Sequence, residues 1–410
     1  MLRYRLLTIL FLPVILGHIL WLSLKNRSGR YFLQRLGFNY AGLPLSSLWF
    51  HCASVGEVNT LMPLLKNIHQ QRPEIKIIIT TNTITGGKIV RQQQLDYLYH
   101  SYLPFDWSFT VNRFIQTVKP QSLQVMETEI WPNLFSACKR SGISINIINA
   151  RLSSKTTSAK PWIKAILQNS LANVNAIYAR TEQDAEAYLQ LGAESDKVTT
   201  VGNLKLSTAL PCGTDSANDR DHFLIDREYV LVASTHKNEE ANISKIWKSL
   251  DREELLIIAP RHPERMPSIL KQLDIKDIAI RSKNDSITSM TQLFILDTVG
   301  ELKNYFANAK LVIMGGSFET IGGHNILEPA AFNRAIITGP YMENFREELQ
   351  LMIEKAAICQ VQSYTELQSK LEGLLENKRQ RQQLEKNTAT LTHDTEEVLQ
   401  RYTQLIEKQC

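Results

Sequence analysis

The sequence predicts an α/β protein made of two doubly wound domains, each built on a parallel sheet. Short apolar runs of strand length alternate with longer helix-like segments, which is the pattern of repeated strand–helix–strand units. The alternation stops once, at the polar stretch 207–219, and then restarts. A chain of 410 residues also exceeds one ordinary core. We therefore predict a first domain over 36–206, a linker over 207–219, and a second domain over 220–410 that ends in charged helices.

Composition restricts the partners of this chain. Lys and Arg exceed Asp and Glu by 46 − 41 = 5, and no long basic run is present. A nucleic-acid partner is therefore not indicated, whereas an anionic substrate or membrane surface is compatible with the charge. The five cysteines are scattered, and no pair has the spacing of metal ligands. Reduced thiols in a cytosolic compartment are the favoured interpretation.

The N-terminus differs from the rest of the chain. Leu6–Leu24 is a run of 19 residues without formal charge, although it contains Pro13, Gly17 and His18. At about 1.5 Å per residue a helix of this length matches a hydrocarbon layer of about 30 Å. Four basic residues follow it closely: Lys25, Arg27, Arg30 and Arg35. We predict a membrane anchor and basic flank over 1–35, spanning or interfacial, with the remainder on the cytoplasmic side. A helix docked on the protein is the alternative.

The first half contains a series of predicted strands that end in polar turns. They are Ser47–Ala53, Lys76–Thr80, Ser122–Met126, Ser144–Ile148, Ala176–Ala179 and the start of Val198–Lys205. Glu57 follows the first strand at a strand-to-helix turn, where functional groups of α/β enzymes gather. Glu127 and Glu129 follow the strand at 122–126, beside Trp131 and Pro132. We expect one of these two acids to face a ligand or a buried cation. The alternative for all three is an acid in the first turn of a helix.

The second half repeats this pattern. Predicted strands are Tyr229–Ala233, Leu255–Ala259, Gln292–Leu296, Leu311–Met314 and Arg334–Thr338. Polar, basic or glycine residues follow the first four of them, at 234–236, 260–265, 297–301 and 315–317. Because parallel strands end at one edge of a sheet, these groups should share a rim, where ligands of open α/β sheets bind.

The stretch from Leu311 to Ala331 is the most informative part of this rim. Gly315, Gly316 and Ser317 follow a strand, and a backbone without side chains there lets a ligand approach closely. A second glycine pair precedes a predicted helix that begins near Ile326. Glu328 lies in its first turn and suits ribose hydroxyls better than a phosphate. A glycine-rich loop with an acid that merely favours the helix dipole is the alternative.

Together these motifs resemble the Kdo transferases of Gram-negative bacteria. The resemblance is carried in order by FHCASVGEV, ITTNTITGG, YLPFD, METEIWPNLF, INARLS, VGNLK, ASTH, PRHPER, LDTVGEL and GGSFETIGGHNILEPAA. It implies a fold of GT-B type, in which two Rossmann-like domains face a cleft. It also implies inverting transfer of 3-deoxy-D-manno-oct-2-ulosonic acid (Kdo) from CMP-Kdo to the lipid A precursor, lipid IVA, at the inner membrane. Two departures are Leu206-Ser207 after VGNLK and the acidic loop Phe318-Glu319-Thr320.

The resemblance also implies roles for individual residues. Glu57 is the expected general base, because an attacking sugar hydroxyl must lose its proton. Lys205 and Arg261 are expected at the leaving phosphate, and Glu127 at the sugar carbon, at Lys205 or at an acceptor hydroxyl. The expected nucleotide-binding residues are Arg261, His262, Val299, Gly300, Glu301, Gly316, Ser317, Asn325, Ile326, Leu327 and Glu328. No metal is expected, since no Asp-x-Asp motif ends a strand of the second half, and no cofactor is expected besides the donor substrate.

Two other functions are compatible with parts of the pattern. A nucleotide-sugar epimerase of the same double design would act on one soluble substrate, which would leave the N-terminal anchor unexplained. A non-catalytic membrane scaffold that binds a nucleotide would not require Glu57, Glu127 and Lys205.

Overall fold

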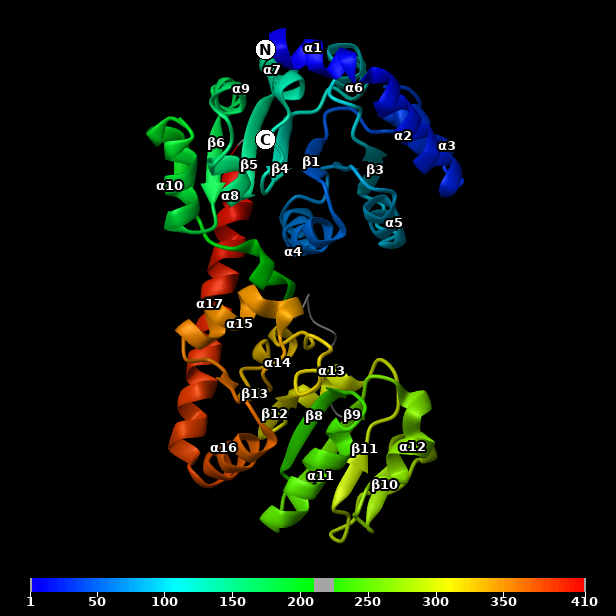
Figure 1. Cartoon of the computed structure of the whole chain (residues 1–410), viewed down its shortest axis with the longest axis vertical. Coiled ribbons are helices and arrows are strands. Elements are labelled where there is room, and N and C mark those ends of the chain that lie inside the picture. Colours follow the sequence, from blue (N-terminus) through cyan, green and yellow to red (C-terminus); the bar gives the residue numbers. More distant parts are fainter. Residues whose placement is uncertain (1, 210–224, 409–410) are drawn as a thin grey trace. The chain divides into compact units, whose positions relative to one another are not determined.

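The computed structural model describes residues 2–209 and 225–408. Most of the predicted linker, 207–219, lies outside the described residues. The chain divides into two compact units, Met1–Thr208 with Glu397–Cys410, and Ala209–Glu396. Each contains one parallel sheet of seven strands flanked by helices (Figure 1), which confirms the predicted fold class of two α/β domains.

The sheet of the first unit has the strand order β3-β2-β1-β4-β5-β6-β7. Its strands are β1 Leu48–Cys52, β2 Ile77–Thr81, β3 Leu98–Tyr102, β4 Ser122–Met126, β5 Ser144–Ala150, β6 Ala176–Ala179 and β7 Val198–Thr200. Its helices after the N-terminal segment are α3 Gly29–Arg35, α4 Val55–Gln71, α5 Ile84–Gln92, α6 Ser108–Val118, α7 Pro132–Arg140, α8 Ser154–Thr157, α9 Pro161–Leu171 and α10 Glu182–Gln190. Successive side chains of β1 enter separate cores on the two faces of the sheet, Leu48 and Phe50 in one and Trp49 in the other.

The N-terminal apolar run forms two helices, α1 Leu2–Leu10 and α2 Leu12–Lys25, and the single long helix predicted there is wrong. Pro13 lies in the first turn of α2, and because proline has no N–H and its ring clashes with the preceding turn, a continuous helix is interrupted. No helix formed by the described residues has both the length and the hydropathy required to cross a bilayer. The segment contacts the first unit: Tyr4 Oη donates to Asp106 Oδ2 at 2.8 Å, and Ile19 packs with Tyr31.

The sheet of the second unit has the strand order β10-β11-β9-β8-β12-β13-β14. Its strands are β8 Tyr229–Thr235, β9 Leu255–Pro260, β10 Ile278–Ile280, β11 Leu293–Ile295, β12 Leu311–Met314, β13 Ile336–Thr338 and β14 Cys359–Gln360. Its helices are α11 Glu239–Leu250, α12 Met266–Leu270, α13 Leu302–Phe306, α14 Leu327–Ala330, α15 Arg346–Glu354, α16 Tyr364–Glu376 and α17 Lys378–Glu407. Leucines of α16 and apolar residues of the central strands share one core.

The end of α17 belongs to the first unit, which corrects the predicted second domain over 220–410. Tyr402 is fully buried there, and its hydroxyl contacts Tyr178 O at 3.2 Å, Gly202 O at 3.1 Å and Asn149 N at 3.2 Å. Ile406 is buried in the same core. This packing was not predicted from the sequence, because α17 is mostly polar and only a few of its side chains, such as Tyr402 and Ile406, pack in the first unit.

Each sheet has one point at which its connections diverge. In the first unit β1 continues to β2 on one side, whereas its neighbour β4 continues to β5 on the other. In the second unit β8 and β12 are the corresponding neighbours, continuing to β9 and β13. In open parallel sheets the crevice beyond the carboxyl ends of such a strand pair is the usual ligand site. We therefore describe two locations, the β1–β4 site and the β8–β12 site.

Candidate active site

Glu57 occupies the β1–β4 site, in the first turn of α4. Ser54 caps this helix by accepting a hydrogen bond from Glu57 N. The Glu57 carboxylate accepts from Ala53 N at 2.8 Å and from Ser54 Oγ at 2.9 Å, and the residue is only 9% exposed. Burial raises the pKa of Glu57 to about 7, with a smaller contribution from the charges of Glu127 and Glu129 and against the effect of the two hydrogen bonds. A carboxyl group with this pKa suits a general base near neutral pH.

Glu127 lies directly after β4, with a backbone φ of 54°. A positive φ is uncommon outside glycine, and here the conformation is held by bonds from Glu127 N to Ile148 O and from Tyr188 Oη to Glu127 O. Its carboxylate forms an ion pair with Arg151, with Nε and Oε2 separated by 2.7 Å. Arg151 is therefore the cation partner of Glu127, but its side chain is 39% exposed and it is not the buried cation that the sequence suggested; it was not among the predicted site residues.

Glu129 is the third carboxylate of the β1–β4 site. Its Oε2 accepts from Asn82 Nδ2 at 3.1 Å and from Trp131 Nε1 at 3.0 Å, and His51 Nε2 lies 3.8 Å away. Burial alone would raise the pKa of Glu129, but the attraction of His51 and the two donated bonds hold that pKa below its ordinary value. Arg35 is almost fully buried and donates to Asn82 Oδ1 at 3.2 Å. The site therefore contains one acid with a raised pKa, Glu57, and one with a lowered pKa, Glu129.

Lys205 follows β7, the outermost strand of the sheet, and lies in a short 3₁₀ turn over Leu204–Ala209. Leu204 N donates to Asn149 Oδ1 at 3.0 Å, which draws this turn back toward β5. Lys205 N donates to Asn203 Oδ1 at 3.0 Å. Lys205 thus belongs to the same unit as the three carboxylates and, like them, lies beyond the carboxyl ends of the parallel strands.

The β8–β12 site brings together residues that follow three strands. His236 follows β8, Arg261 and His262 follow β9, and His324 lies in the loop between β12 and α14. The Nε2 atoms of His236 and His324 are 2.8 Å apart, and the rings of His236 and His262 are in edge contact with centroids 5.5 Å apart. Arg261 and His262 were predicted here, whereas His236 and His324 were missed as site residues.

The glycine loop after β12 is held by a buried carboxylate. Glu239 accepts from Gly316 N at 2.7 Å, from His236 N at 2.8 Å and from Phe318 N at 3.0 Å, and it has no exposed surface. Ser317 is equally buried and accepts a bond from Gly339 N. The N–H groups of Gly316 and Phe318 therefore face Glu239 and not an incoming ligand.

The remaining predicted nucleotide residues lie in two loops. Glu301 pairs with Arg281 at 2.9 Å and accepts from Thr298 Oγ1 at 2.6 Å, beside Gly300 and the 88% exposed Val299. Asn325 Nδ2 donates to the exposed Glu328 at 3.2 Å, and Asn325 Oδ1 accepts from Leu327 N. The side chains of Ile326 and Leu327 are buried in the protein core, so only their backbone is available to a ligand.

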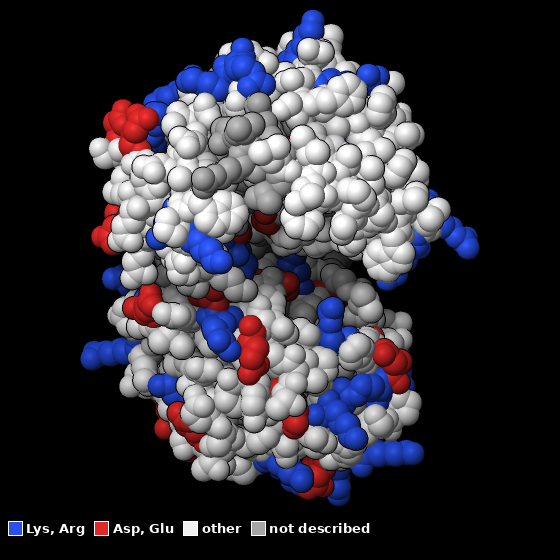
Figure 2. Space-filling model, turned by 45° about the horizontal axis from the view of Figure 1, so that its top comes forward, with Lys and Arg blue, Asp and Glu red and all other residues white. Residues whose placement is uncertain are grey.

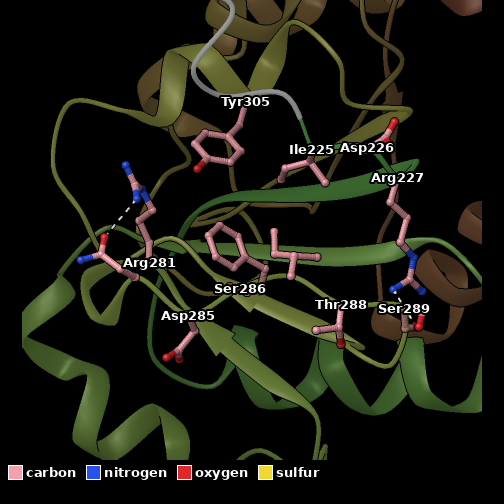
Figure 3. A pocket seen from close by; sticks show the side chains of 12 residues that line it. Ile225, Asp226, Arg227, Arg281, Asp285, Ser286, Thr288, Ser289 and Tyr305 are labelled. Carbon is pink, nitrogen blue, oxygen red and sulfur yellow. Dashed lines mark hydrogen bonds between the residues drawn. The ribbon is translucent and has the colours of Figure 1, made fainter.

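A separate cavity of about 670 Å³ lies in the second unit, and its lining contains none of the predicted nucleotide residues. Figure 3 shows Arg281 and Arg227 at opposite ends of its lining, with Tyr305 and Ile225 between them. Arg227 donates to Glu253 O and Thr291 O, so it holds backbone in place. The cavity touches the predicted site only through Arg281, the partner of Glu301.

In the described part of the chain, no group of three or more His, Cys, Asp or Glu side chains is arranged to hold a metal ion. The expectation that the protein works without a metal stays a prediction.

The sequence has clear relatives. A family model described as 3-deoxy-D-manno-octulosonic-acid transferase (kdotransferase) matches residues 26–208. The 3-deoxy-D-manno-octulosonic acid transferase of Haemophilus influenzae is 35% identical over 393 residues, which cover 93% of this chain and 92% of that protein. The enzyme of the same name from Rickettsia bellii is 30% identical over 369 residues, covering 88% of this chain and 87% of that protein.

Solved structures resemble the fold at much lower identity. The UDP-GlcNAc 2-epimerase of Neisseria meningitidis superposes with a TM-score of 0.55 at 13% identity, covering 88% of this chain and 99% of that chain. A glycosyltransferase of Rickettsia africae gives a TM-score of 0.50 at 10% identity, covering 89% and 98%. These likenesses show a fold used by both epimerases and glycosyltransferases. The sequence relatives distinguish between the two, and they show that the chain belongs to the Kdo transferase family of glycosyltransferases.

Proposed function

We propose that this protein transfers Kdo from CMP-Kdo to a hydroxyl group of the lipid A precursor, lipid IVA, with inversion at the anomeric carbon. The observation that carries the proposal is Glu57, a buried carboxyl with a pKa of about 7 at the β1–β4 site. The names of the relatives supply the transferred sugar. The first unit would bind the acceptor and the second unit the donor nucleotide.

The proposed reaction is a single displacement. The acceptor hydroxyl oxygen forms a bond to the anomeric carbon of Kdo, and the bond from that carbon to the phosphate oxygen breaks. The hydroxyl proton passes to Glu57, and CMP leaves with the electron pair of the broken bond. A sugar hydroxyl is a weak nucleophile until its proton is removed, and a positioned base contributes about 10²–10⁴-fold in rate.

Charge stabilisation would come from fixed groups of the protein. Glu127, oriented by Arg151, would stabilise positive charge at the sugar carbon, and Lys205 and Arg261 would stabilise the departing phosphate. Charged groups that the protein already holds in place stabilise a transition state strongly, because they need not reorganise during the reaction.

The donor nucleotide would bind at the β8–β12 site. Arg261 and His262 are exposed there, and Glu328 is an exposed acid oriented by Asn325. We assign the phosphate to the side of the site that holds Arg261 and His262, and the ribose hydroxyls to Glu328. A carboxylate repels a phosphate and accepts hydrogen bonds from hydroxyls. The segment 299–301 would border the nucleotide base.

The test of the whole proposal is product analysis. Purified protein is incubated with CMP-Kdo and a tetra-acylated lipid A precursor, and the lipids are weighed by mass spectrometry. The expected result is a lipid heavier by one or more Kdo units, together with free CMP. An isomerised nucleotide sugar with no change in the lipid would instead support an epimerase, and binding without any product would support a scaffold.

We also propose that α1 and α2 attach the protein to the inner membrane by lying in its interface, with the two units on the cytoplasmic side. In Figure 2 the first unit presents a face on which uncharged residues predominate, with Lys and Arg side chains along its upper border. The exposed apolar side chains of α1, α2 and the turn between them are Leu6, Ile9, Leu10, Phe11, Val14, Leu20, Trp21 and Leu24. Apolar groups beside basic ones suit an anionic lipid surface.

Orientation can be tested in cells. Protease added outside spheroplasts is expected to leave both units intact until the membrane is permeabilised. Cleavage of the units in sealed spheroplasts would contradict the cytoplasmic assignment.

A further inference from the structure

Two histidines from distant parts of the chain meet at the β8–β12 site. His236 follows β8, His324 precedes α14, and their Nε2 atoms are 2.8 Å apart with ring planes inclined by only 12°. Gly316 makes room for them, because a Cβ at this position would lie 2.8 Å from the His324 ring. The contact is a hydrogen bond only if one Nε2 carries a proton and the other does not.

The shared proton determines what the other ring nitrogens present. In the uncharged pair one Nδ1 carries a proton and the other is bare, whereas uptake of one more proton makes both Nδ1 atoms donors. Both residues are partly exposed. Within residues 2–209 and 225–408, neither Nδ1 makes a hydrogen bond, so both remain available to a ligand.

The groups around the pair disfavour an added positive charge until an anion arrives. His236 faces His262, Arg261, Arg265 and Glu240, and His324 faces His236, Arg261 and His262. The one acid among them, Glu240, is bound by Arg265 through two contacts of 3.0 and 3.2 Å.

These surroundings favour the uncharged form of both imidazoles. Burial and the neighbouring cations lower the pKa of His236, and lower that of His324 to about 4. A negative ligand placed beside the pair would reverse this penalty.

Two amides of the glycine loop after β12 are not free for an anion. The N–H groups of Gly316 and Phe318 both donate to Glu239, so these two have little to offer a phosphate. The same carboxylate accepts from His236 N, so it fixes the backbone that carries one imidazole of the pair. Side chains at this site can recognise an anion, and the paired imidazoles lie next to Arg261.

We propose that the His236–His324 pair contacts the nucleotide phosphate beside Arg261 and takes up one proton from solvent when that phosphate binds. This inference rests on the proposed function, because it takes the nucleotide to be the ligand of this unit. It adds a reason for the arrangement: when the bond to the sugar breaks, the phosphate changes from a singly charged diester to a monoester with a second negative charge. A second Nδ1–H donor opposes that developing charge.

The experiment is a calorimetric titration of the full-length protein with CMP and with cytidine at pH 7.5, in two buffers of different ionisation enthalpy. At this pH the free CMP phosphate is largely dianionic, since its second pKa is about 6. The difference in heat between the buffers counts the protons bound. We expect net proton uptake with CMP and none with cytidine, which lacks the phosphate.

Variants assign the proton to the pair. His324→Asn is expected to abolish the uptake and weaken CMP binding about tenfold, as for a lost charge-assisted bond, while cytidine affinity stays unchanged. His393→Asn is the matched control, because His393 is an exposed histidine of α17, and it should behave as the parent. If His324→Asn does not fold, an NMR titration of the parent serves instead, and CMP at pH 7.5 should shift imidazole resonances toward the protonated form.

The outcomes separate this inference from the proposed function. CMP that binds without proton uptake, or with equal affinity to His324→Asn and the parent, would overturn the role of the pair and leave the nucleotide site standing. Failure of the parent protein to bind either CMP or cytidine would overturn both.

Discussion

Glu57, Glu127 and Glu129 all lie at the β1–β4 site, and their surroundings give the three carboxyl groups different properties. Glu57 is buried with only two donors, Glu127 is paired with Arg151, and Glu129 is surrounded by donors. The pKa of Glu57 is raised and that of Glu129 is lowered, and pKa values pushed apart in this way are typical of an acid–base site. The same chemical group is thus directed to separate roles by burial and hydrogen bonding.

Replacing Glu57 by Gln should reduce turnover at least about a hundredfold, because the amide cannot accept the proton of the attacking hydroxyl. Binding of CMP, measured by calorimetry, should stay unchanged. Glu182→Gln is the control, since Glu182 is also an acid in the first turn of a helix of the same unit and is exposed. Near-parental turnover in Glu57→Gln would rule out the base.

The pH dependence of turnover follows from the same residue. The pKa of Glu57 is raised to about 7, and only the ionised form is a base, so the rate should rise with pH through about 7 and fall below it. Burial in the folded protein disfavours the ionised form of Glu57. The stability of the folded protein should therefore fall as pH rises from about 4.5 to about 7, while the rate increases. A pH–rate profile whose acidic limb lies near pH 4.5 would contradict the shifted pKa.

Glu328 is assigned to the ribose, and this can be tested with two ligands. Glu328→Gln should weaken CMP binding about tenfold, the loss expected for a charge-assisted bond. Binding of 2′-deoxy-CMP, which lacks one hydroxyl, should change much less if that hydroxyl is the partner. Unchanged CMP affinity in Glu328→Ala would remove the residue from the site.

At the scale of elements, α1 and α2 show how one proline changes the form of an apolar segment. Pro13 ends the helical hydrogen-bonding pattern between the two, and the apolar side chains then lie along two short helices. Tyr4 and Ile19 hold these helices on the first unit, which a spanning segment would not need. These contacts fit a helix docked on the protein, the alternative considered for this segment, and attachment along a membrane surface remains our proposal.

The double variant Phe11→Asp, Val14→Asp should weaken binding to vesicles containing anionic lipid by about tenfold or more, since each change removes an apolar group from the interface and adds repulsion. Co-sedimentation with vesicles measures this. Met290→Asp is a matched control, because Met290 is 70% exposed in the second unit. Equal sedimentation of all three proteins would contradict the proposed contact.

At the scale of the whole molecule, the last turns of α17 return to the first unit. The Tyr402 hydroxyl contacts backbone groups that follow or lie in β5, β6 and β7. The C-terminal segment is therefore a structural part of the unit that holds Glu57.

Tyr402→Phe should lower the free energy of unfolding of the first unit by about 1–3 kcal/mol, because three buried backbone groups lose a partner. Thermal denaturation followed by circular dichroism measures it. Gln404→Ala, an exposed change two residues away, should leave the melting temperature unchanged. A melting temperature of Tyr402→Phe equal to that of the parent would contradict the role of the hydroxyl.

Local patterns predicted most of the elements. The strands at 122–126, 176–179 and 311–314 match their predicted bounds, because each is a short apolar run between polar turns. The strands β3, β10 and β14 were missed, since β3 carries His100 and Ser101 and the other two are very short. Motif order sufficed for the family, and Glu57, Arg261 and His262 were found at the carboxyl ends of their strands.

The sequence by itself determined the alternation of strands and helices, the two-domain plan and the family, because these depend on local periodicity and ordered motifs. Only the tertiary structure decided which strands are neighbours, and therefore that β1 meets β4 and β8 meets β12. That pairing places Glu57 near Glu127, brings His236 to His324, and turns the glycine-loop amides toward Glu239. Contacts between residues far apart in the chain depend on packing and burial, which no local pattern records.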